Sequence, residues 1–375
     1  MNRSDIKRNR YMLKGTLGKE GYDWWWHSFT AYHKVTGEPK SFFIEYFIIN
    51  PKLNPKKVVL GQLPEHQNQG IKPSYVMIKA GCWGKDAVQL HGFYPTKELK
   101  IHNRPLSLEV GSCKLSETSM CGRVNMTRQQ SKKHPEYMSD AGMMQWNLNI
   151  SKQITFNVGY GASKVFRKLN AFEMYWHAEG MKTQYKGAVI LNGEEYEVIP
   201  EKSYGYADKN WGKDFTSPWL WLGCSHIIRE SDGKVLENSA LDIGGGCPKV
   251  FGISLKRKLL MNFFYEGKDT EYNFSKPWLN SRVVFRVEQT EKEVIWKIIA
   301  QDMHALIKLK VICKKEEMLN INYEAPNGKK LHNRLWNGGT GEGQMLVYNK
   351  QGKSEQLQER FYLRNVGCEY GEYSH

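Results

Sequence analysis

Apolar and aromatic residues recur along this chain in short runs that are separated by Gly, Asn, Asp or Pro, and helical periodicity is scarce. Runs rich in Val, Ile, Tyr, Phe and Trp that end at such residues are typical of β-strands. We therefore predict strands at residues 22–32, 42–49, 74–81, 86–93, 142–150, 172–179, 184–191, 219–228, 234–243, 249–254, 258–264, 282–288, 293–300, 305–313, 318–323 and 343–348.

Three dipeptides mark tight turns between these runs: Asn192-Gly193, Asp232-Gly233 and Asn327-Gly328. Asn-Gly and Asp-Gly readily adopt the positive φ values that a hairpin turn requires. The pattern predicts an antiparallel, all-β chain with enough strands for two barrels or sandwiches.

The length of 375 residues exceeds that of a single ordinary core and favours two domains. We place the boundary near Pro200, which gives domains 1–200 and 201–375. The polar segment Gly111–Tyr137 is expected to form a long loop or flap, and the polar tail from Gln351 is expected to frame the last strand or lie loose.

The composition excludes several classes of function. The net charge of +15 is spread along the whole chain without a zinc-finger, RRM or basic-helix signature. We therefore expect a solvated basic surface and no nucleic-acid partner. A second interpretation is peripheral contact with an anionic membrane. No apolar run approaches the length of a membrane span, and the N-terminus lacks the apolar segment of a secretion signal, which predicts a cytoplasmic protein. Seven scattered cysteines and eleven histidines without a ligand spacing predict neither a disulfide framework nor a metal site.

One stretch, Ser203–Ile227, concentrates the candidate chemistry. It combines Trp211, Trp219 and Trp221 with an acid at Asp208 and an amide at Asn210. Residues 208–214 include Asn, Gly and two Asp, so we predict a polar turn that leads into a buried strand at 219–228 and projects side chains into a cavity.

Asp208 is the candidate catalytic residue. A carboxyl group beside several indole rings is desolvated, which raises its pKa and allows it to act as a general acid near neutral pH. The alternative is an Asp that caps a turn or pairs with Lys209 or an arginine, and the sequence leaves both interpretations open. Asn210, Tyr206 and the glycine-flanked Glu342 are further candidates.

The run Trp24-Trp25-Trp26 lies in the first predicted strand, so Trp25 should point to the face opposite its two neighbours. Trp25 and Trp336 either belong to the core or line an apolar cavity that binds the substrate. Two glycine clusters, DIGGG at 242–246 and GGTGEG at 338–343, lack the strand–turn–helix context of a phosphate loop. They are expected where backbones bend or approach closely.

The stretch YADKNWGKDFTSPWLWLGCSHI resembles the central signature of the tocopherol cyclase family, Y-x-E-K-N-W-G followed by a proline and a W-x-W strand. FFIEYFIINP, WHAEGMKTQYKGAVILNGEEYEV and HNRLWNGGTGEGQMLVY resemble further segments of that family, in order, between Tyr22 and Tyr348. Two positions depart from the pattern: Asp208 replaces the family's Glu, and Gly223-Cys224 replaces a Gln after the W-x-W strand.

The resemblance implies two lipocalin-like antiparallel β-barrel domains and an apolar or aromatic small-molecule substrate. It implies an enzyme that protonates the double bond of a prenylated hydroquinone and closes a chromanol-type ring, without a cofactor or metal. In that assignment Asp208 is the acid, Asn210 or Tyr206 orients the quinol hydroxyl, and the faces of Trp211, Trp219 and Trp221 stabilise the cation.

Three other functions remain open. A hydratase, like the carotenoid hydratases related to this family, would use the same acid and admit water to the cation. A lipocalin-like carrier would bind an isoprenoid or quinone without chemistry. A carbohydrate-active protein would use tryptophan faces and paired carboxylates on a sugar.

Overall fold

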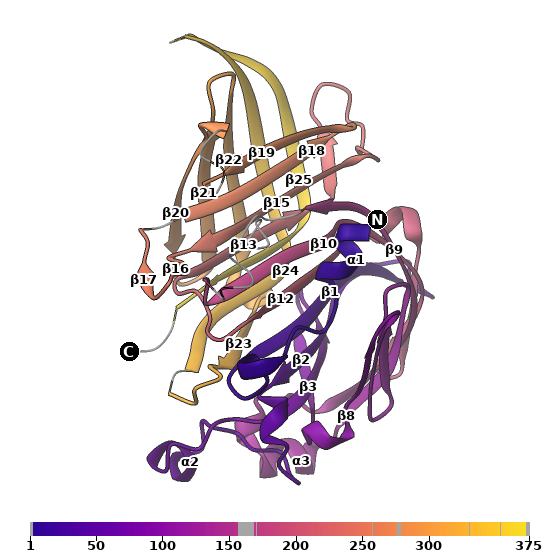
Figure 1. Ribbon diagram of the computed structural model, residues 1–375. Coiled ribbons are helices and arrows are strands. Elements are labelled where there is room, and N and C mark those ends of the chain that lie inside the picture. Colours follow the sequence, from indigo (N-terminus) through magenta and orange to yellow (C-terminus); the bar gives the residue numbers. More distant parts are fainter. Residues whose placement is uncertain are drawn as a thin grey trace.

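The computed structural model of the protein describes residues 3–156, 169, 171–256, 258–274, 276, 279–329, 331–352 and 354–372. Two large antiparallel sheets, of twelve and eleven strands, make up most of it (Figure 1). The prediction of an antiparallel, all-β fold is confirmed.

The first sheet has the order β4-β3-β2-β1-β11-β10-β9-β8-β7-β6-β5. β12 pairs with both β1 and β10, so β11 and β12 fill the space between those two long strands one after the other. Its strands are β1 (Tyr22–His33), β2 (Pro39–Ile49), β3 (Tyr75–Cys82), β4 (Val88–Tyr94), β5 (Lys100–Asn103), β6 (Leu106–Val110), β7 (Cys113–Ser116), β8 (Ser119–Met126), β9 (Gly142–Phe156), β10 (Met174–Leu191), β11 (Glu194–Val198) and β12 (Gly205–Gly212).

The second sheet has the order β19-β18-β15-β13-β25-β24-β22-β21-β20, with β14 paired to β25 and β23 paired to β24. A small ribbon of β16 (Lys249–Val250) and β17 (Ile253–Ser254) lies apart from it. The strands of the sheet are β13 (Trp219–Cys224), β14 (His226–Arg229), β15 (Ser239–Gly246), β18 (Lys258–Tyr265), β19 (Lys268–Asn273), β20 (Arg282–Gln289), β21 (Glu293–Gln301), β22 (Ala305–Lys314), β23 (Leu319–Glu324), β24 (Leu331–Gln351) and β25 (Ser354–Gly371).

The helices of the described residues are short and connect strands or flank the sheets. They are α1 (Arg3–Arg8), α2 (Pro64–Asn68) and α3 (Arg128–Lys133), with 3-10 turns η1 (Gly15–Gly18), η2 (Pro51–Leu53), η3 (Thr96–Glu98), η4 (Pro135–Tyr137), η5 (Pro200–Lys202) and η7 (Lys315–Glu317). None of these helices is long and apolar enough to cross a membrane.

The predicted turns lie where the sequence placed them. Asn192 and Gly193, with φ of 52° and 94°, join β10 to β11. Asn327-Gly328 joins β23 to β24, and Asp232-Gly233 lies between β14 and β15. The glycine of each turn has a positive φ, 68° at Gly233 and 73° at Gly328, which is the left-handed backbone that a tight turn needs.

Two predictions about irregular segments are wrong. The expected flap Gly111–Tyr137 contains β7, β8 and α3. The tail after Gln351 forms β25, a central strand of the second sheet. The boundary near Pro200 stays a prediction. The change from the first sheet to the second falls between Gly212 and Trp219, because β12 pairs with β1 and β10. The YADKNWG signature therefore belongs to the first sheet.

The apolar core has three parts. One cluster fills the interior of the first sheet and another fills that of the second. A third cluster, which we call the seam, lies where the sheets meet and contains aromatic residues from both. Its members include Trp26, Phe47, Trp176, Tyr206, Trp219, Trp221 and Tyr323.

Candidate functional site

The signature stretch forms a strand and not the expected turn. β12 runs from Gly205 to Gly212 and all eight of its residues are buried between β1 and β10. Because side chains alternate along a strand, Tyr206, Asp208 and Asn210 face the seam, whereas Lys209 faces the interior of the first sheet. Trp26 lies directly opposite Asp208 on β1.

Asp208 is 7% exposed and is held by two indole N–H groups. Trp176 Nε1 donates to its Oδ2 at 2.8 Å and Trp24 Nε1 donates to its Oδ1 at 3.4 Å. Burial raises the pKa of Asp208 well above its ordinary value, and the negative charges of Asp242 and Glu369 raise it further, against the lowering effect of the indole donors. These surroundings favour the neutral, protonated form of the Asp208 carboxyl over the carboxylate.

A second buried acid, Asp242 on β15, lies across the seam. Tyr206 Oη donates to its Oδ2 at 3.2 Å, and Trp221 Nε1 donates to its Oδ1 at 3.0 Å. Burial raises the pKa of Asp242 well above its ordinary value as well. Tyr206 thus joins β12 of the first sheet to β15 of the second.

A third acid, Glu369 on β25, completes the cluster. Trp219 Nε1 donates to its Oε2 at 2.7 Å and Asn337 Nδ2 donates to its Oε1 at 2.7 Å. Burial raises the pKa of this carboxyl to about 7. Trp219 also makes an edge contact with Trp176, with ring centroids 5.9 Å apart, so the indoles that hold Asp208 and Glu369 touch each other.

Asn210 lies one position beyond Asp208 on the same face. Its Oδ1 accepts a hydrogen bond of 2.7 Å from Tyr22 Oη. Its Nδ2 is buried and has no hydrogen-bond partner among the described residues. Asn210 can therefore still donate a hydrogen bond to an oxygen atom in the seam.

Lys209 is not the partner of Asp208. Its ammonium group forms an ion pair with Asp23 on the other face of the first sheet, where both side chains are fully buried, and lies 3.9 Å from the ring centroid of Trp25. Asp208 is also far from any turn, in the middle of β12. Neither structural alternative that the sequence left open for Asp208 matches its position.

Four of the predicted site residues lie away from Asp208. Trp25 packs in the interior of the first sheet, on the face opposite Trp24 and Trp26, as the alternation predicted. Trp211 belongs to the seam cluster, where it stacks on Tyr175 with ring centroids 5.5 Å apart, and Lys209 Nζ lies 5.4 Å from its ring centroid.

The other two are on the second sheet. Trp336 packs against the core of that sheet, with Lys315 Nζ 5.0 Å from its ring centroid. Glu342 is exposed and lines a surface pocket together with Glu293 and Lys310. In each case the strand register, which the sequence does not display, decides the direction of the side chain.

The glycine clusters make room for indole rings. A Cβ at Gly244 would lie 2.4 Å from Trp176, and one at Gly339 would lie 2.2 Å from Trp83. Close approach was the expected role of these glycines, and here the approaching group is an aromatic side chain. Gly244 thus leaves the space in which Trp176 reaches Asp208.

Sequence reasoning missed Trp24 and Trp176 as ligands of Asp208, and Glu369 altogether. Asp242 was considered only within a glycine cluster and as one of the paired carboxylates of a carbohydrate-active protein. The available signal was chemical: acids within strongly apolar strands, as at Asp242 in SALDIGGG and Glu369 in VGCEYG. No group of three or more His, Cys, Asp or Glu that could hold a metal is present among the residues that the structure describes.

Several solved structures are similar to this chain at low sequence identity. A putative AttH from Nitrosomonas europaea has 11% identity and a TM-score of 0.49 over 94% of this chain and 92% of that one. Kievitone hydratase from Nectria haematococca has 11% identity and a TM-score of 0.45 over 94% and 89%. CghA with Sch210972 has 10% identity and a TM-score of 0.47 over 95% and 90%.

No curated protein matches the sequence. The family model described as tocopherol cyclase-like matches residues 100–371. This match begins at the first residue of β5 and ends at the last residue of β25, so it covers most of the chain and includes Asp208, Asp242 and Glu369. The chain belongs to the tocopherol cyclase-like family.

Proposed function

We propose that this protein is an enzyme that adds an oxygen nucleophile to a carbon–carbon double bond under acid catalysis, and that its reaction is the cyclisation of a prenylated hydroquinone to a chromanol-type ring. The observation that carries the proposal is Asp208, a buried carboxyl group with a raised pKa that two tryptophans hold in an aromatic seam. Family membership makes an isoprenoid a reasonable substrate class.

An alkene is a weak base, so its protonation requires a strong proton donor in a site without competing water. Desolvation keeps the proton on Asp208 until an alkene carbon lies within reach. When the proton leaves, the N–H groups of Trp176 and Trp24 already point at the oxygen atoms that gain charge. This preorganisation stabilises the carboxylate as it forms.

Proton transfer to the alkene carbon nearer Asp208 leaves a tertiary carbocation on the other carbon. The electron-rich faces of aromatic rings attract a cation and do not react with it. In this proposal the cation lies against the faces of Trp24 and Trp176, whose N–H groups donate to Asp208, and of Trp219, which contacts Trp176. The phenol oxygen then forms the new C–O bond and loses its proton, so the product is an isomer of the substrate and no step requires a redox group.

The test is turnover in deuterated water. The purified protein and its Asp208→Asn variant are incubated with prenylated hydroquinones and linear isoprenoids, and the products are analysed by mass spectrometry. Asparagine keeps an oxygen that can accept an indole hydrogen bond but has no acidic proton. We expect a cyclic isomer with one carbon-bound deuterium from the natural sequence and none from Asp208→Asn.

Asp232→Asn is the matched control, because Asp232 is an exposed carboxylate paired with Arg229. It should turn over like the natural sequence. A product heavier by one deuterated water would identify a hydratase. Unchanged substrate throughout the panel would contradict catalysis and favour a carrier, and binding of soluble glycans in place of isoprenoids would favour a carbohydrate-active protein.

A further inference from the structure

A row of polar side chains crosses the first sheet at the level of Asp208. The register places Trp26 opposite Asp208, Glu45 opposite Trp26, Lys79 opposite Glu45 and His91 opposite Lys79, on five neighbouring strands. Directly opposed residues point to the same face of a sheet. The whole row therefore faces the seam.

Glu45 and Lys79 form an ion pair in the middle of this row. Lys79 Nζ lies 2.9 Å from Glu45 Oε2, and both side chains are 0% exposed. Tyr323 of the second sheet covers the pair: its hydroxyl donates to the same Oε2 at 2.9 Å, and Lys79 Nζ lies 4.0 Å from its ring centroid. Removing such a pair from water costs several kcal/mol per ion, so its position in an aromatic seam requires an explanation.

The pair leaves hydrogen-bonding capacity unused in the seam. Glu45 Oε1 is buried without a hydrogen-bond partner among the described residues, and so is Trp26 Nε1 beside it. One is an acceptor and the other is a donor, and their residues face each other across β1 and β2. A hydroxyl group, which donates and accepts at once, satisfies both atoms.

The spacing suits one substrate between this pair and Asp208. Asp208 and Glu45 are separated by two strand spacings, about 10 Å. The reacting groups would fill about the same length. The distance from a proton donor through the two alkene carbons to an attacking oxygen, plus a hydrogen bond from that oxygen to a carboxylate, is about 10 Å. Trp24 lies beside this line, because it donates to Asp208 and stacks on Tyr323 with centroids 5.1 Å apart.

We propose that Glu45, with Lys79, Tyr323 and Trp26, forms a hydroxyl-binding subsite that holds the oxygen nucleophile of the substrate and accepts its proton. This inference rests on the proposed function and names the group at the other end of the reaction. Glu45 and Lys79 lie outside the residues that the family model matches.

The proton and electron balance is complete. Asp208 gives its proton to one alkene carbon, and the π electrons form that C–H bond. The phenol oxygen supplies the electron pair of the new C–O bond, and its proton passes to Glu45 Oε1. The enzyme then holds one proton on Glu45 and a negative charge on Asp208, and transfer of that proton back to Asp208 restores the starting state.

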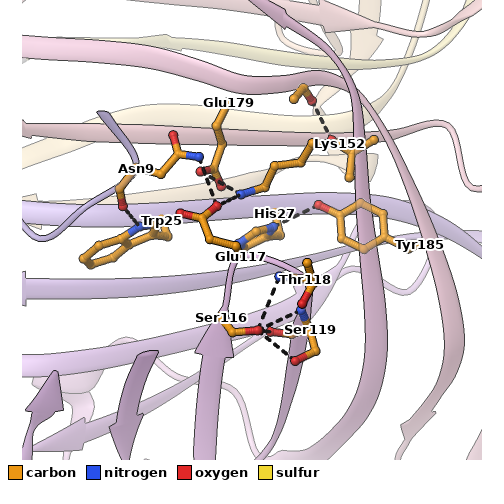
Figure 2. Close-up of polar contacts among 12 residues, drawn as sticks. Asn9, Trp25, His27, Ser116, Glu117, Thr118, Ser119, Lys152, Glu179 and Tyr185 are labelled. Carbon is orange, nitrogen blue, oxygen red and sulfur yellow. Dashed lines mark hydrogen bonds and ion pairs between the residues drawn. The ribbon is translucent and has the colours of Figure 1, made fainter. Parts of the chain in front are cut away.

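The chain offers a matched control for Glu45. Glu179 is also fully buried, and its Oε2 lies 2.9 Å from Lys152 Nζ. Figure 2 shows this second ion pair with Glu117 and Asn9, beside Trp25 on the face of the first sheet that points away from the seam. Glu45→Gln and Glu179→Gln are therefore the same substitution in two buried Lys–Glu pairs.

The first experiment measures binding and does not depend on turnover. Quenching of tryptophan fluorescence gives the Kd of a geranylated hydroquinone and of its O-methyl ether at the ring-closing oxygen. We expect the natural sequence to bind the free hydroxyl at least tenfold more tightly, as a hydrogen bond to a charged group allows. Glu45→Gln should lose most of this preference, whereas Asp208→Asn and Glu179→Gln should keep it.

Tyr323→Phe gives a second test that leaves the ion pair in place. It removes the hydroxyl that orients Glu45 and should reduce the preference about threefold, as the loss of one modest hydrogen bond does. Equal affinities for the two ligands in the natural sequence would overturn the subsite, and so would a preference that survives in Glu45→Gln.

The second experiment separates the two proposals. In deuterated water, Glu45→Gln should still take up deuterium into recovered open-chain substrate, because Asp208 still forms the cation, which then loses a proton from carbon. The ratio of ring product to deuterated substrate should fall at least tenfold relative to Glu179→Gln. If Glu45→Gln lost both the ring product and the deuterated substrate in parallel, Glu45 would be a structural residue. If the natural sequence preferred the free hydroxyl in binding but showed no turnover, the subsite would be supported and the proposed reaction contradicted.

Discussion

Glu324 gives a quantitative test of how carboxyl groups behave at the junction of the two sheets. It is the last residue of β23, is 4% exposed, and its Oε1 accepts the backbone N–H of Gln62 from the connection between β2 and β3. Burial raises its pKa from 4.5 to about 7. Glu324→Gln keeps an oxygen for that N–H and removes the ionisation.

The sign of the effect follows from proton binding. Because the folded state holds the Glu324 proton more tightly than the unfolded chain does, stability falls as the pH rises from the unfolded pKa to the folded one. With pKa values of about 7 and 4.5, the carboxyl costs the folded state about 3 kcal/mol at pH 8 and about 1 kcal/mol at pH 5. The substitution should therefore improve stability relative to the natural sequence by about 2 kcal/mol more at pH 8 than at pH 5.

The assay is urea unfolding between pH 5 and pH 8, followed by tryptophan fluorescence for both proteins. The exposed Glu342→Gln serves as the control and should reproduce the pH dependence of the natural sequence. A stability difference between Glu324→Gln and the natural sequence that stays constant across this range would refute the reasoning, because it would mean that Glu324 ionises alike in the folded and unfolded chains.

Three further results are expected. Activity should fall on the alkaline side as the pH passes the raised pKa of Asp208. Asp208→Glu should keep measurable turnover, whereas Asp208→Asn should have none. A pH–rate profile without an alkaline limb would contradict an acid at this position. Gly244→Ala should cost about 1–3 kcal/mol of stability in urea unfolding, because the added methyl group meets the ring of Trp176. The same substitution should lower turnover more than substrate binding. An unchanged rate would mean that Trp176 does not assist Asp208. Lys209→Met should cost about 3–5 kcal/mol of folding stability, since it leaves Asp23 buried without its cation. The folded fraction of this variant should still incorporate deuterium into the product. Loss of that incorporation would connect Lys209 to the chemistry.

The sequence predicted most of the strands because their apolar residues must face a core. Runs such as 42–49 and 293–300 are recognisable without any knowledge of their neighbours. The short strands β6 to β8 were missed because alternate residues face solvent and the segment is polar as a whole. β12 was missed for the opposite reason: its polar residues are buried, and their partners come from other strands.

The sequence by itself determined the all-β class, the hairpin turns and the family signature, and it singled out Asp208 as the candidate acid, because local patterning and residue chemistry carry that information. Only the tertiary structure decided which side chains surround Asp208. Trp24, Trp176, Asp242 and Glu369 come from four strands far apart in the chain, and the pairing register sets which of their neighbours turn away. A shift of one residue in that register would send each side chain to the opposite face, and the raised pKa of Asp208 depends on the burial that the correct face provides.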